Sequence, residues 1–344
     1  MKSLKLVRLA GALALASGFG TASGQEVVLK VEHFLGPNST AQQQLLGPWC
    51  EKIAKESANK MKCQIYPAMQ LGGTPPQLFD QAKDGVVDIA WTLPTYQAGR
   101  FSKSEVFELP FLIKTAETGS PALWDYIQKN ALDEYKGVKL ILTHVHDGAQ
   151  FHFTTKDVKT LEDLKGLKVR APTRISSRVL TALGAVPVQM PVPQVPEAMS
   201  KGVVDGASLP WEVVPALKID EIAKTHTETA PGQATMSNSI FAVVMNQAKY
   251  DSLPADLKKV IDANSGVAAS QWAGKIWDGT IAPARKSALE HKATINVITA
   301  AEYDRWKKAT ENVDKEWFTE VAAKGGNGPA LLEDAKAMIK KYGG

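Results

Sequence analysis

The sequence has few of the features that mark an enzyme, a membrane protein or a nucleic-acid-binding protein. After the N-terminal segment, no apolar run approaches the ~18 to 20 residues that a transmembrane helix needs. The GxSxG, HExxH, Walker and GxGxxG motifs are missing, and no ordered acid/base pair can be read from residue spacing. Runs of Lys and Arg are also missing. We therefore expect neither an enzyme, nor a nucleic-acid-binding protein, nor a protein that is itself inserted into a membrane.

The first 24 residues have the organisation of a secretory signal peptide. Lys2, Lys5 and Arg8 precede the apolar run 9–15, and small residues lead up to Gly24. No cysteine stands at the expected cleavage point, so we do not expect a lipid-anchored form. Removal of this segment lowers the formal net charge from +4 to +1, so the basic character of the chain belongs mostly to the signal. We expect a freely diffusing protein in the periplasm of a Gram-negative bacterium.

Cysteine is scarce, with only Cys50 and Cys63 in the chain, and their spacing is not the CxxC of a redox or zinc site. In an oxidising compartment the two are expected to form a disulfide that ties the first helix to the strand after it. Closing this loop would stabilise the fold by roughly 2 to 3 kcal/mol. The alternative is a pair of buried free thiols.

Strand-like segments alternate with helical ones along the chain, which indicates an α/β fold with parallel sheets. The segments 85–94 and 202–210 repeat a helix-ending glycine, a Val-Val-Asp strand start and an exit loop, so we expect two α/β domains of similar local architecture. Crossing strands would hinge them around a cleft. The predicted division is a signal peptide at 1–24, a first domain of 25–148 plus about 237–275, and a second domain of 149–236 plus about 276–344.

A helical pattern continues from Asp251 to His291, long enough to lie across both predicted domains. A kink is expected one turn before Pro283. Further on, Thr299 and Glu302 form a capping box that opens another helix.

The most informative stretch for function surrounds Arg170. Thr160 can cap a short helix that ends at Gly166, an apolar strand follows, and Arg170 stands at the exit of that strand. Pro172-Thr173 then opens another helix. Ligands of open α/β sheets lie beyond the carboxyl ends of the strands, and a guanidinium matches a carboxylate with two parallel hydrogen bonds. We expect an anion site at Arg170; a structural ion pair is the alternative.

Three segments, QIYPAMQLGG, LEDLKGLKVRAP and PEAMSKGVVDGASLPWE, together with the signal peptide, make the chain resemble the solute-binding proteins of tripartite ATP-independent periplasmic (TRAP) transporters, the DctP-like family. The similarity covers essentially the whole mature chain. It implies two α/β domains that close over a small organic anion, a long helix across both, and delivery of the ligand to a membrane permease.

The resemblance also implies which residues bind the ligand. The carboxylate-binding arginine of the family maps onto Arg170. A subset that takes 2-oxo or 2-hydroxy acids uses a glutamine and a Trp-Glu pair, matched here by Gln150, Trp211 and Glu212, and Gln150 with Glu212 could take part in holding a metal ion. The loops that this fold directs to the cleft add His33, Phe34, Trp91, Thr92 and Tyr96.

Three histidines, His144, His146 and His152, offer a separate way to hold a metal, although such residues more often pack or bond locally. We otherwise expect no cofactor. The inventory of cleft residues predicts a small monocarboxylate with an aromatic or apolar body or a 2-oxo or 2-hydroxy group, because a second carboxylate would need a second cation. Arg174 and Arg100 are the candidates, and their directions are left open. An ABC-type or sensor-coupled binding protein, or a periplasmic enzyme on the same scaffold, remains the alternative.

Overall fold

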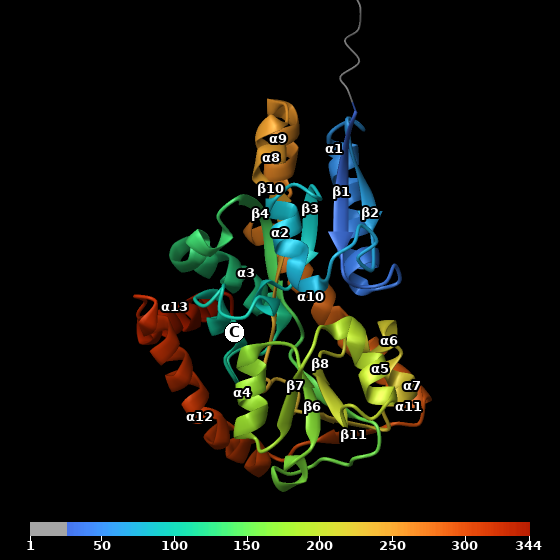
Figure 1. The fold of residues 1–344 in the computed structure, drawn as a ribbon, viewed down its shortest axis with the longest axis vertical. Coiled ribbons are helices and arrows are strands. Elements are labelled where there is room, and N and C mark those ends of the chain that lie inside the picture. Colours follow the sequence, from blue (N-terminus) through green and yellow to red (C-terminus); the bar gives the residue numbers. More distant parts are fainter. Residues whose placement is uncertain (1–25) are drawn as a thin grey trace, which may run out of the picture.

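The computed structural model describes residues 26–344, and the predicted signal peptide at 1–24 lies outside the described residues. Two mixed sheets, each with its own helices, stand one above the other (Figure 1). No helix in the described part of the chain is both long and apolar enough to cross a bilayer. The architecture confirms the predicted α/β class with two sheets, but the sheets are not purely parallel as predicted, because β10 (Ile240–Asn246) and β5 (Gln150–Phe153) run antiparallel to their neighbours.

The upper sheet in Figure 1 has the strand order β2-β1-β3-β10-β4. Its strands are β1 (Val27–His33), β2 (Met61–Tyr66), β3 (Ile89–Thr92), β4 (Val138–Val145) and β10 (Ile240–Asn246). β1 pairs in parallel with β2 and β3, whereas β10 runs antiparallel between β3 and β4. The central position of β10 explains its almost unbroken apolar sequence, since both of its faces are buried.

The lower sheet has the order β11-β9-β5-β8-β6-β7. Its strands are β5 (Gln150–Phe153), β6 (Lys168–Ala171), β7 (Val186–Gln189), β8 (Gly206–Leu209), β9 (Thr225–Glu228) and β11 (Thr294–Val297). β6 is parallel to both of its neighbours, β7 and β8. We call the upper sheet with its helices the first unit, and the lower sheet with its helices the second unit.

Helices cover both sheets. The first unit carries α1 (Gly47–Glu56), α2 (Leu78–Lys83), α3 (Ala116–Tyr126), α8 (Gln247–Ser252), α9 (Ala255–Ala263) and α10 (Val267–Gly279). The second unit carries α4 (Arg174–Ala182), α5 (Val195–Ser200), α6 (Val213–Ala216), α7 (Ile219–Ile222) and α11 (Ile281–Glu290), and the chain ends with α12 (Ala300–Ala323) and α13 (Gly328–Lys341).

The single long helix predicted from Asp251 to His291 is wrong, because this segment forms four helices, α8 to α11. Pro254, with an extended ψ of 151°, separates α8 from α9. Gly266 separates α9 from α10 with a φ of 92°, a conformation that glycine adopts at little cost. Only Thr280 separates α10 from α11, so the break expected one turn before Pro283 is confirmed.

The helix predicted between Thr160 and Gly166 is also wrong in type. The structure has a single 3₁₀ turn there, Glu162–Leu164. The Asp163 carboxylate accepts hydrogen bonds from both the backbone N–H and the hydroxyl of Thr160, as a capping residue would. Gly166 then ends the turn with a φ of 75°. The start and stop signals stand too close together for an α-helix to propagate between them.

The helix α12 lies along one side of the molecule and contacts both units (Figure 1). Its start is the predicted cap, where the Thr299 hydroxyl oxygen accepts a hydrogen bond from the Glu302 N–H at 3.2 Å. Trp306 packs against Phe151 of the second unit, and the Trp317 indole N–H donates to a carbonyl of the first unit at 2.8 Å. The following α13 packs on α3 of the first unit. The predicted domain boundaries themselves stay a prediction.

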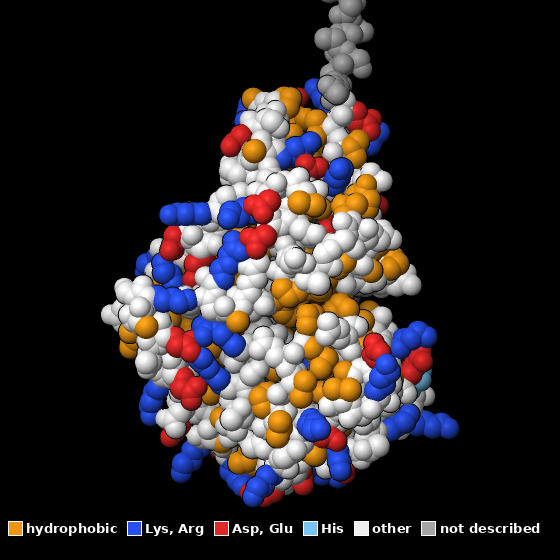
Figure 2. Space-filling model, viewed as in Figure 1, with side chains coloured by type: hydrophobic (Ala, Val, Ile, Leu, Met, Phe, Trp, Pro, Cys, Tyr) orange, Lys and Arg blue, Asp and Glu red, His pale blue; other side chains and the backbone are white. Residues whose placement is uncertain are grey.

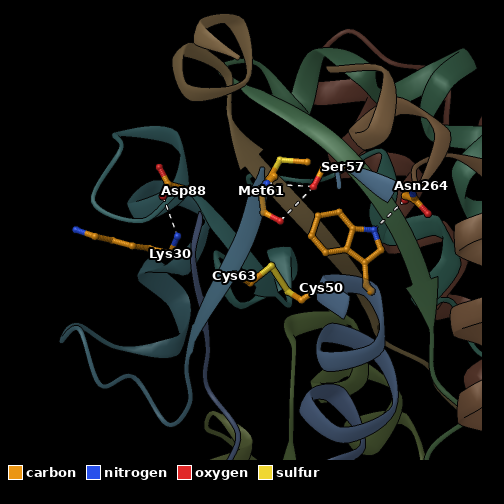
Figure 3. The surroundings of a disulfide bond; sticks show 8 residues. Lys30, Cys50, Ser57, Met61, Cys63, Asp88 and Asn264 are labelled. Atoms are coloured by element: carbon orange, nitrogen blue, oxygen red, sulfur yellow. Dashed lines mark hydrogen bonds between the residues drawn. A yellow bond between two sulfur atoms is a disulfide. The ribbon is translucent and has the colours of Figure 1, made fainter. Parts of the chain in front are cut away.

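The predicted disulfide between Cys50 and Cys63 is present and joins α1 to β2, with 5.7 Å between the two Cα atoms (Figure 3). On the same strand, the Met61 N–H donates to the Ser57 hydroxyl oxygen at 3.1 Å. The strand is therefore fixed to the end of α1 by a covalent bond and by a hydrogen bond.

Candidate functional site

A cavity lies between the two sheets and holds about 420 Å³ of empty space, including its mouth. On the face shown in Figure 2, hydrophobic side chains gather at the waist between the upper and lower halves. Both units contribute to the lining: Phe34, Leu35, Trp91, Leu93, Tyr96, His146, Ala149, Arg170, Pro172, Val192, Ser208, Leu209, Pro210, Glu212, Val213, Ser239 and Phe241.

Arg170 is the cationic residue of this lining, and its side chain is only 2% exposed. Its Nε donates to the Met190 carbonyl and its Nη1 to the Ser208 carbonyl, both at 3.0 Å. These bonds fix the plane of the guanidinium and leave further N–H groups free. Within residues 26–344 no carboxylate forms an ion pair with it, and burial lowers its pKa. The site is therefore a buried cation that lacks an anion.

Local sequence explains the position of Arg170. The strand β6 is parallel to its neighbours, so Arg170 lies near the carboxyl edge of the second sheet. Thr173 caps the following helix α4 as predicted, and its hydroxyl oxygen accepts a hydrogen bond from the Ser176 N–H. Strand exit and helix start thus lie on one side of the cavity.

Three aromatic rings form a stacked wall opposite the second unit. The rings of Phe34 and Trp91 lie 4.7 Å apart, and those of Trp91 and Phe241 lie 5.0 Å apart with only 7° between their planes. The Trp91 indole N–H donates to His144 Nε2 at 2.8 Å, which fixes the ring within β3 and β4. All three rings contribute apolar surface to the lining of the cavity.

Tyr96 connects the two units at the cavity. Its hydroxyl oxygen accepts a hydrogen bond from the Val192 N–H of the second unit at 3.0 Å. Burial raises the pKa of the Tyr96 hydroxyl, while the neighbouring Arg170 cation acts in the opposite direction. The neutral hydroxyl therefore keeps its proton available beside the guanidinium.

Glu212 is the acidic residue of the lining, and it also borders a second cavity beside α10 and α11. Burial raises the pKa of its carboxyl to about 7, and the nearby Thr40 and Trp277 side chains lower it only in part. This carboxyl therefore keeps its proton to a higher pH than an ordinary glutamate, and within the described residues it forms no ion pair with Arg170.

The structure brings together five of the predicted site residues, namely Phe34, Trp91, Tyr96, Arg170 and Glu212. Two others lie behind the lining and make contacts inside the protein. His33 bonds through Nε2 to the Gln42 side-chain oxygen at 2.9 Å, and Thr92 is buried in β3.

The remaining two predicted site residues, Gln150 and Trp211, line a different cavity. The Gln150 side-chain oxygen accepts a hydrogen bond from the Thr229 N–H at 3.3 Å, and the Trp211 indole donates to Glu228 at 2.9 Å. Gln150 and Glu212, the residues expected to take part in any metal site, thus border separate spaces. Whether they bind ligand or metal stays a prediction.

The three histidines considered for a metal have separate environments. His144 accepts from Trp91, His146 accepts from the Gly148 N–H, and His152 bonds to His226 at 2.6 Å between their Nδ1 atoms. The described residues contain no group of three His, Cys, Asp or Glu side chains arranged to hold a metal ion.

The two arginines considered as a second cation are both engaged elsewhere. Arg174 is 18% exposed and forms ion pairs with Glu105 of the first unit and Glu320 of α12. Arg100 pairs with Asp80 at 2.7 Å. Neither of them lines the cavity.

Sequence reasoning missed several lining residues, among them His146 as a cavity group, Ser208, Ser239 and Phe241. The local signal for Phe241 was an aromatic residue in a strand that returns to the first sheet. For His146 and Ser239 the missing information is the strand register, which places them side by side at the ends of β4 and β10.

Comparisons with known proteins agree with this geometry. A family model, DctP: bacterial extracellular solute-binding protein, family 7, matches residues 31–320. A TRAP solute-binding protein from Rhodoferax ferrireducens, solved with copurified benzoate, is 46% identical, with a TM-score of 0.91 over 92% of this chain and 98% of the other.

A marine metagenome TRAP solute-binding protein, solved with 3-hydroxybenzoate, is 42% identical, with a TM-score of 0.91 over 93% of this chain and 100% of the other. The protein TsaT of Comamonas testosteroni, described as an outer membrane transporter protein, is 25% identical and covers 96% of this chain and 95% of its own length. The chain therefore belongs to the DctP family of bacterial extracellular solute-binding proteins, family 7, and is a TRAP transporter solute-binding protein.

Proposed function

We propose that this protein captures a small aromatic monocarboxylate in the periplasm and delivers it to a TRAP membrane permease. The observation that carries the proposal is the buried Arg170 guanidinium, which is held by two carbonyl groups and faces an aromatic wall without a paired carboxylate. The ligand would supply the missing anion.

The free energy of the site favours such a ligand. An unpaired buried charge is costly, and a carboxylate that accepts two hydrogen bonds from the guanidinium offsets that cost. Because Nε and Nη1 already bond to carbonyl groups, the guanidinium needs no further ordering when the ligand arrives. The preorganised fork therefore increases affinity for a carboxylate.

The charge inventory supports a ligand with one carboxylate. Within the part of the chain that the structure describes, Arg170 is the one Lys or Arg side chain that lines the cavity. Arg174 is neutralised by its two acidic partners. A second carboxylate would be buried without a cation and close to Glu212, which would add repulsion as Glu212 ionises.

The body of the ligand is expected to be aromatic. Phe34, Trp91 and Phe241 line the cavity, and an aromatic ligand that stacks on one of these rings would gain about 0.5–1.5 kcal/mol beyond simple burial. Benzoate and 3-hydroxybenzoate in the two solved relatives support the same class of ligand. The periplasmic location and the permease partner are supported by the family.

A thermal-shift screen followed by calorimetry tests the proposal. Benzoate should raise the melting temperature of the mature protein, whereas succinate and glucose should have little effect, because a bound ligand stabilises the folded state in proportion to its affinity. Mass spectrometry of ligand released from freshly purified protein gives independent identification. A larger shift with succinate or glucose than with aromatic acids would contradict the proposal.

A further inference from the structure

His146 and Ser239 form a polar pair in the cavity that carboxylate binding by Arg170 does not use. The antiparallel register of β4 and β10 pairs Val145 with Ile240, so His146 and Ser239 are the next residues on adjacent strand ends. Both belong to the lining of the cavity. They lie on the first-sheet side, and Arg170 with Ser208 lies on the other.

The backbone of this pair is held by one side chain. The Asn238 side-chain oxygen accepts hydrogen bonds from the His146 N–H at 3.2 Å and from the Ser239 N–H at 2.8 Å. The Asn238 amide in turn donates to the His146 carbonyl at 3.1 Å. Both residues are therefore fixed relative to each other before any ligand binds.

Hydrogen bonding also determines the tautomer of His146. The Gly148 N–H can only donate, and it lies 2.9 Å from His146 Nδ1, so this ring nitrogen accepts and the neutral ring carries its proton on Nε2. Gly148 has a φ of 85°, and a Cβ there would overlap Thr235, so the turn that aims this N–H requires glycine. Burial lowers the pKa of His146 to about 3, with smaller effects from His144 and Arg170, so the ring stays neutral.

The result is a polar pair with free hydrogen-bonding capacity. His146 Nε2–H has no hydrogen-bond partner within residues 26–344, and the Ser239 hydroxyl has none either in this part of the chain. His144 is a useful contrast, because its Nε2 accepts from Trp91 and its Nδ1 bonds to the Val145 carbonyl at 3.0 Å. His144 is satisfied by the protein, whereas His146 needs an acceptor from outside.

We infer that His146 and Ser239 recognise a hydroxyl group on the ring of the ligand, so that the protein selects hydroxylated aromatic monocarboxylates over unsubstituted ones. The hydroxyl oxygen accepts a hydrogen bond from His146 Nε2–H, and the hydroxyl hydrogen is donated to Ser239 Oγ. This inference rests on the proposed function, since the carboxylate is held by Arg170 at the other side of the cavity.

The test compares ligands of equal shape that differ in the hydroxyl. Calorimetry with 3- and 4-hydroxybenzoate, each against the methylbenzoate of the same ring position, should show one hydroxy acid bound about tenfold more tightly than its methyl counterpart, as two net hydrogen bonds would give. A site built for a hydroxyl leaves its own polar groups unpaired when the methyl analogue binds.

Substitutions of His146 and Ser239 test whether these two residues cause the preference for a hydroxyl group. His146→Phe should reduce the hydroxyl-to-methyl ratio to about one, and Ser239→Ala should reduce it about threefold. His146→Gln, whose amide N–H can donate from a similar place, should restore part of the ratio. Benzoate affinity and the melting temperature of each variant report whether the cavity and fold are intact. If His146→Phe does not fold, the ratios in Ser239→Ala and His146→Gln carry the test.

The outcomes separate the two proposals. If benzoate binds and Arg170→Ala abolishes that binding, but neither hydroxy acid is preferred, the inference about the pair is wrong and the proposed function stands. A hydroxyl preference that survives unchanged in His146→Phe or Ser239→Ala also overturns the inference. If no aromatic acid binds, the proposed function itself fails.

Discussion

The two units contribute opposite kinds of chemistry to the shared cavity. The first unit provides the stacked rings of Phe34, Trp91 and Phe241, and the second provides Arg170 held by backbone carbonyl groups. The first unit thus supplies aromatic surface to the cavity, and the second unit supplies a buried positive charge. Under the proposed function, a ligand would contact both units at once, so binding and approach of the units would be coupled.

The largest expected effect comes from removing the charge of the second unit. Arg170→Ala should weaken benzoate binding by about 2–5 kcal/mol, because a desolvated carboxylate loses its partner. Arg170→Lys should also bind poorly, since an ammonium cannot reproduce the planar fork. Calorimetry on folded protein measures both.

Arg305→Ala is the matched control for Arg170. Arg305 is an exposed arginine of α12 that pairs with Glu162 and Glu302, and its loss should leave affinity unchanged. Wild-type affinity in a folded Arg170→Ala protein would refute the assignment of charge recognition to the second unit.

A second difference between the units is covalent, because only the first unit contains a disulfide. Replacing Cys50 and Cys63 with alanine should lower the free energy of unfolding by roughly 3 kcal/mol, as expected for a loop of this length. Benzoate affinity should remain the same, since neither cysteine borders the cavity. Urea unfolding with and without a reductant, together with thiol labelling, measures this, and two reactive thiols in the unreduced protein would contradict the pairing.

Glu212 stands where the units meet, and its titration should make stability depend on pH. Its folded pKa of about 7 lies above the ordinary 4.5, so the folded protein holds this proton more tightly than the unfolded chain. The resulting stabilisation is present below about pH 4.5 and is lost as the pH rises through 7.

Relative to Glu212→Gln, the wild type should lose roughly 2 kcal/mol of stability between about pH 5 and pH 7.5. The comparison with the variant cancels the contribution of Glu108, whose pKa is raised to about 8 by burial. The pKa of Asp147 is raised by burial and then by the neighbouring Glu212 charge, so the difference between the two proteins reports these two coupled acids together. Parallel stability curves for the two proteins, measured by urea unfolding at each pH, would show that Glu212 ionises normally.

The smallest expected effect comes from changing the aromatic wall of the first unit. Phe34→Leu should weaken benzoate binding by about 0.5–1.5 kcal/mol, because it removes one ring from the wall while keeping apolar volume. The same substitution should weaken the binding of cyclohexanecarboxylate less, because this acid has the same charge but no π-system. Equal losses for the two acids would mean that the wall recognises apolar area and not aromatic character.

The position of Arg170, the positive charge of the second unit, could largely be predicted from the sequence. Arg170 lies between local signals, a strand before it and the Thr173 cap after it, which depend on only a few neighbouring residues. The disulfide followed in the same way from the first helix and the next strand. Short-range rules of this kind carry enough information to place a side chain at a strand end.

The aromatic wall of the first unit could be predicted only in part. Phe34, Trp91 and Tyr96 follow from loops that the fold directs to the cleft, but Phe241 reaches the wall through the insertion of β10 between β3 and β4, a long-range pairing. The same pairing sets His146 beside Ser239. Long-range register cannot be read from a local sequence pattern. Gln150 and Trp211 were expected beside Glu212 because of the resemblance to a subset of the family, and the structure places them along a different cavity.

The chain passes between the two units at several places: from β4 to β5, from β9 to β10, at Thr280 between α10 and α11, and along α12. Several separate connections leave the two units few ways to move relative to each other. Rotation about an axis close to the connecting segments distorts those segments least. Under the proposed function, the free energy of carboxylate binding at Arg170 would favour essentially one motion, a rotation of one unit relative to the other. A membrane partner would then have a single variable to sense, the angle between the units.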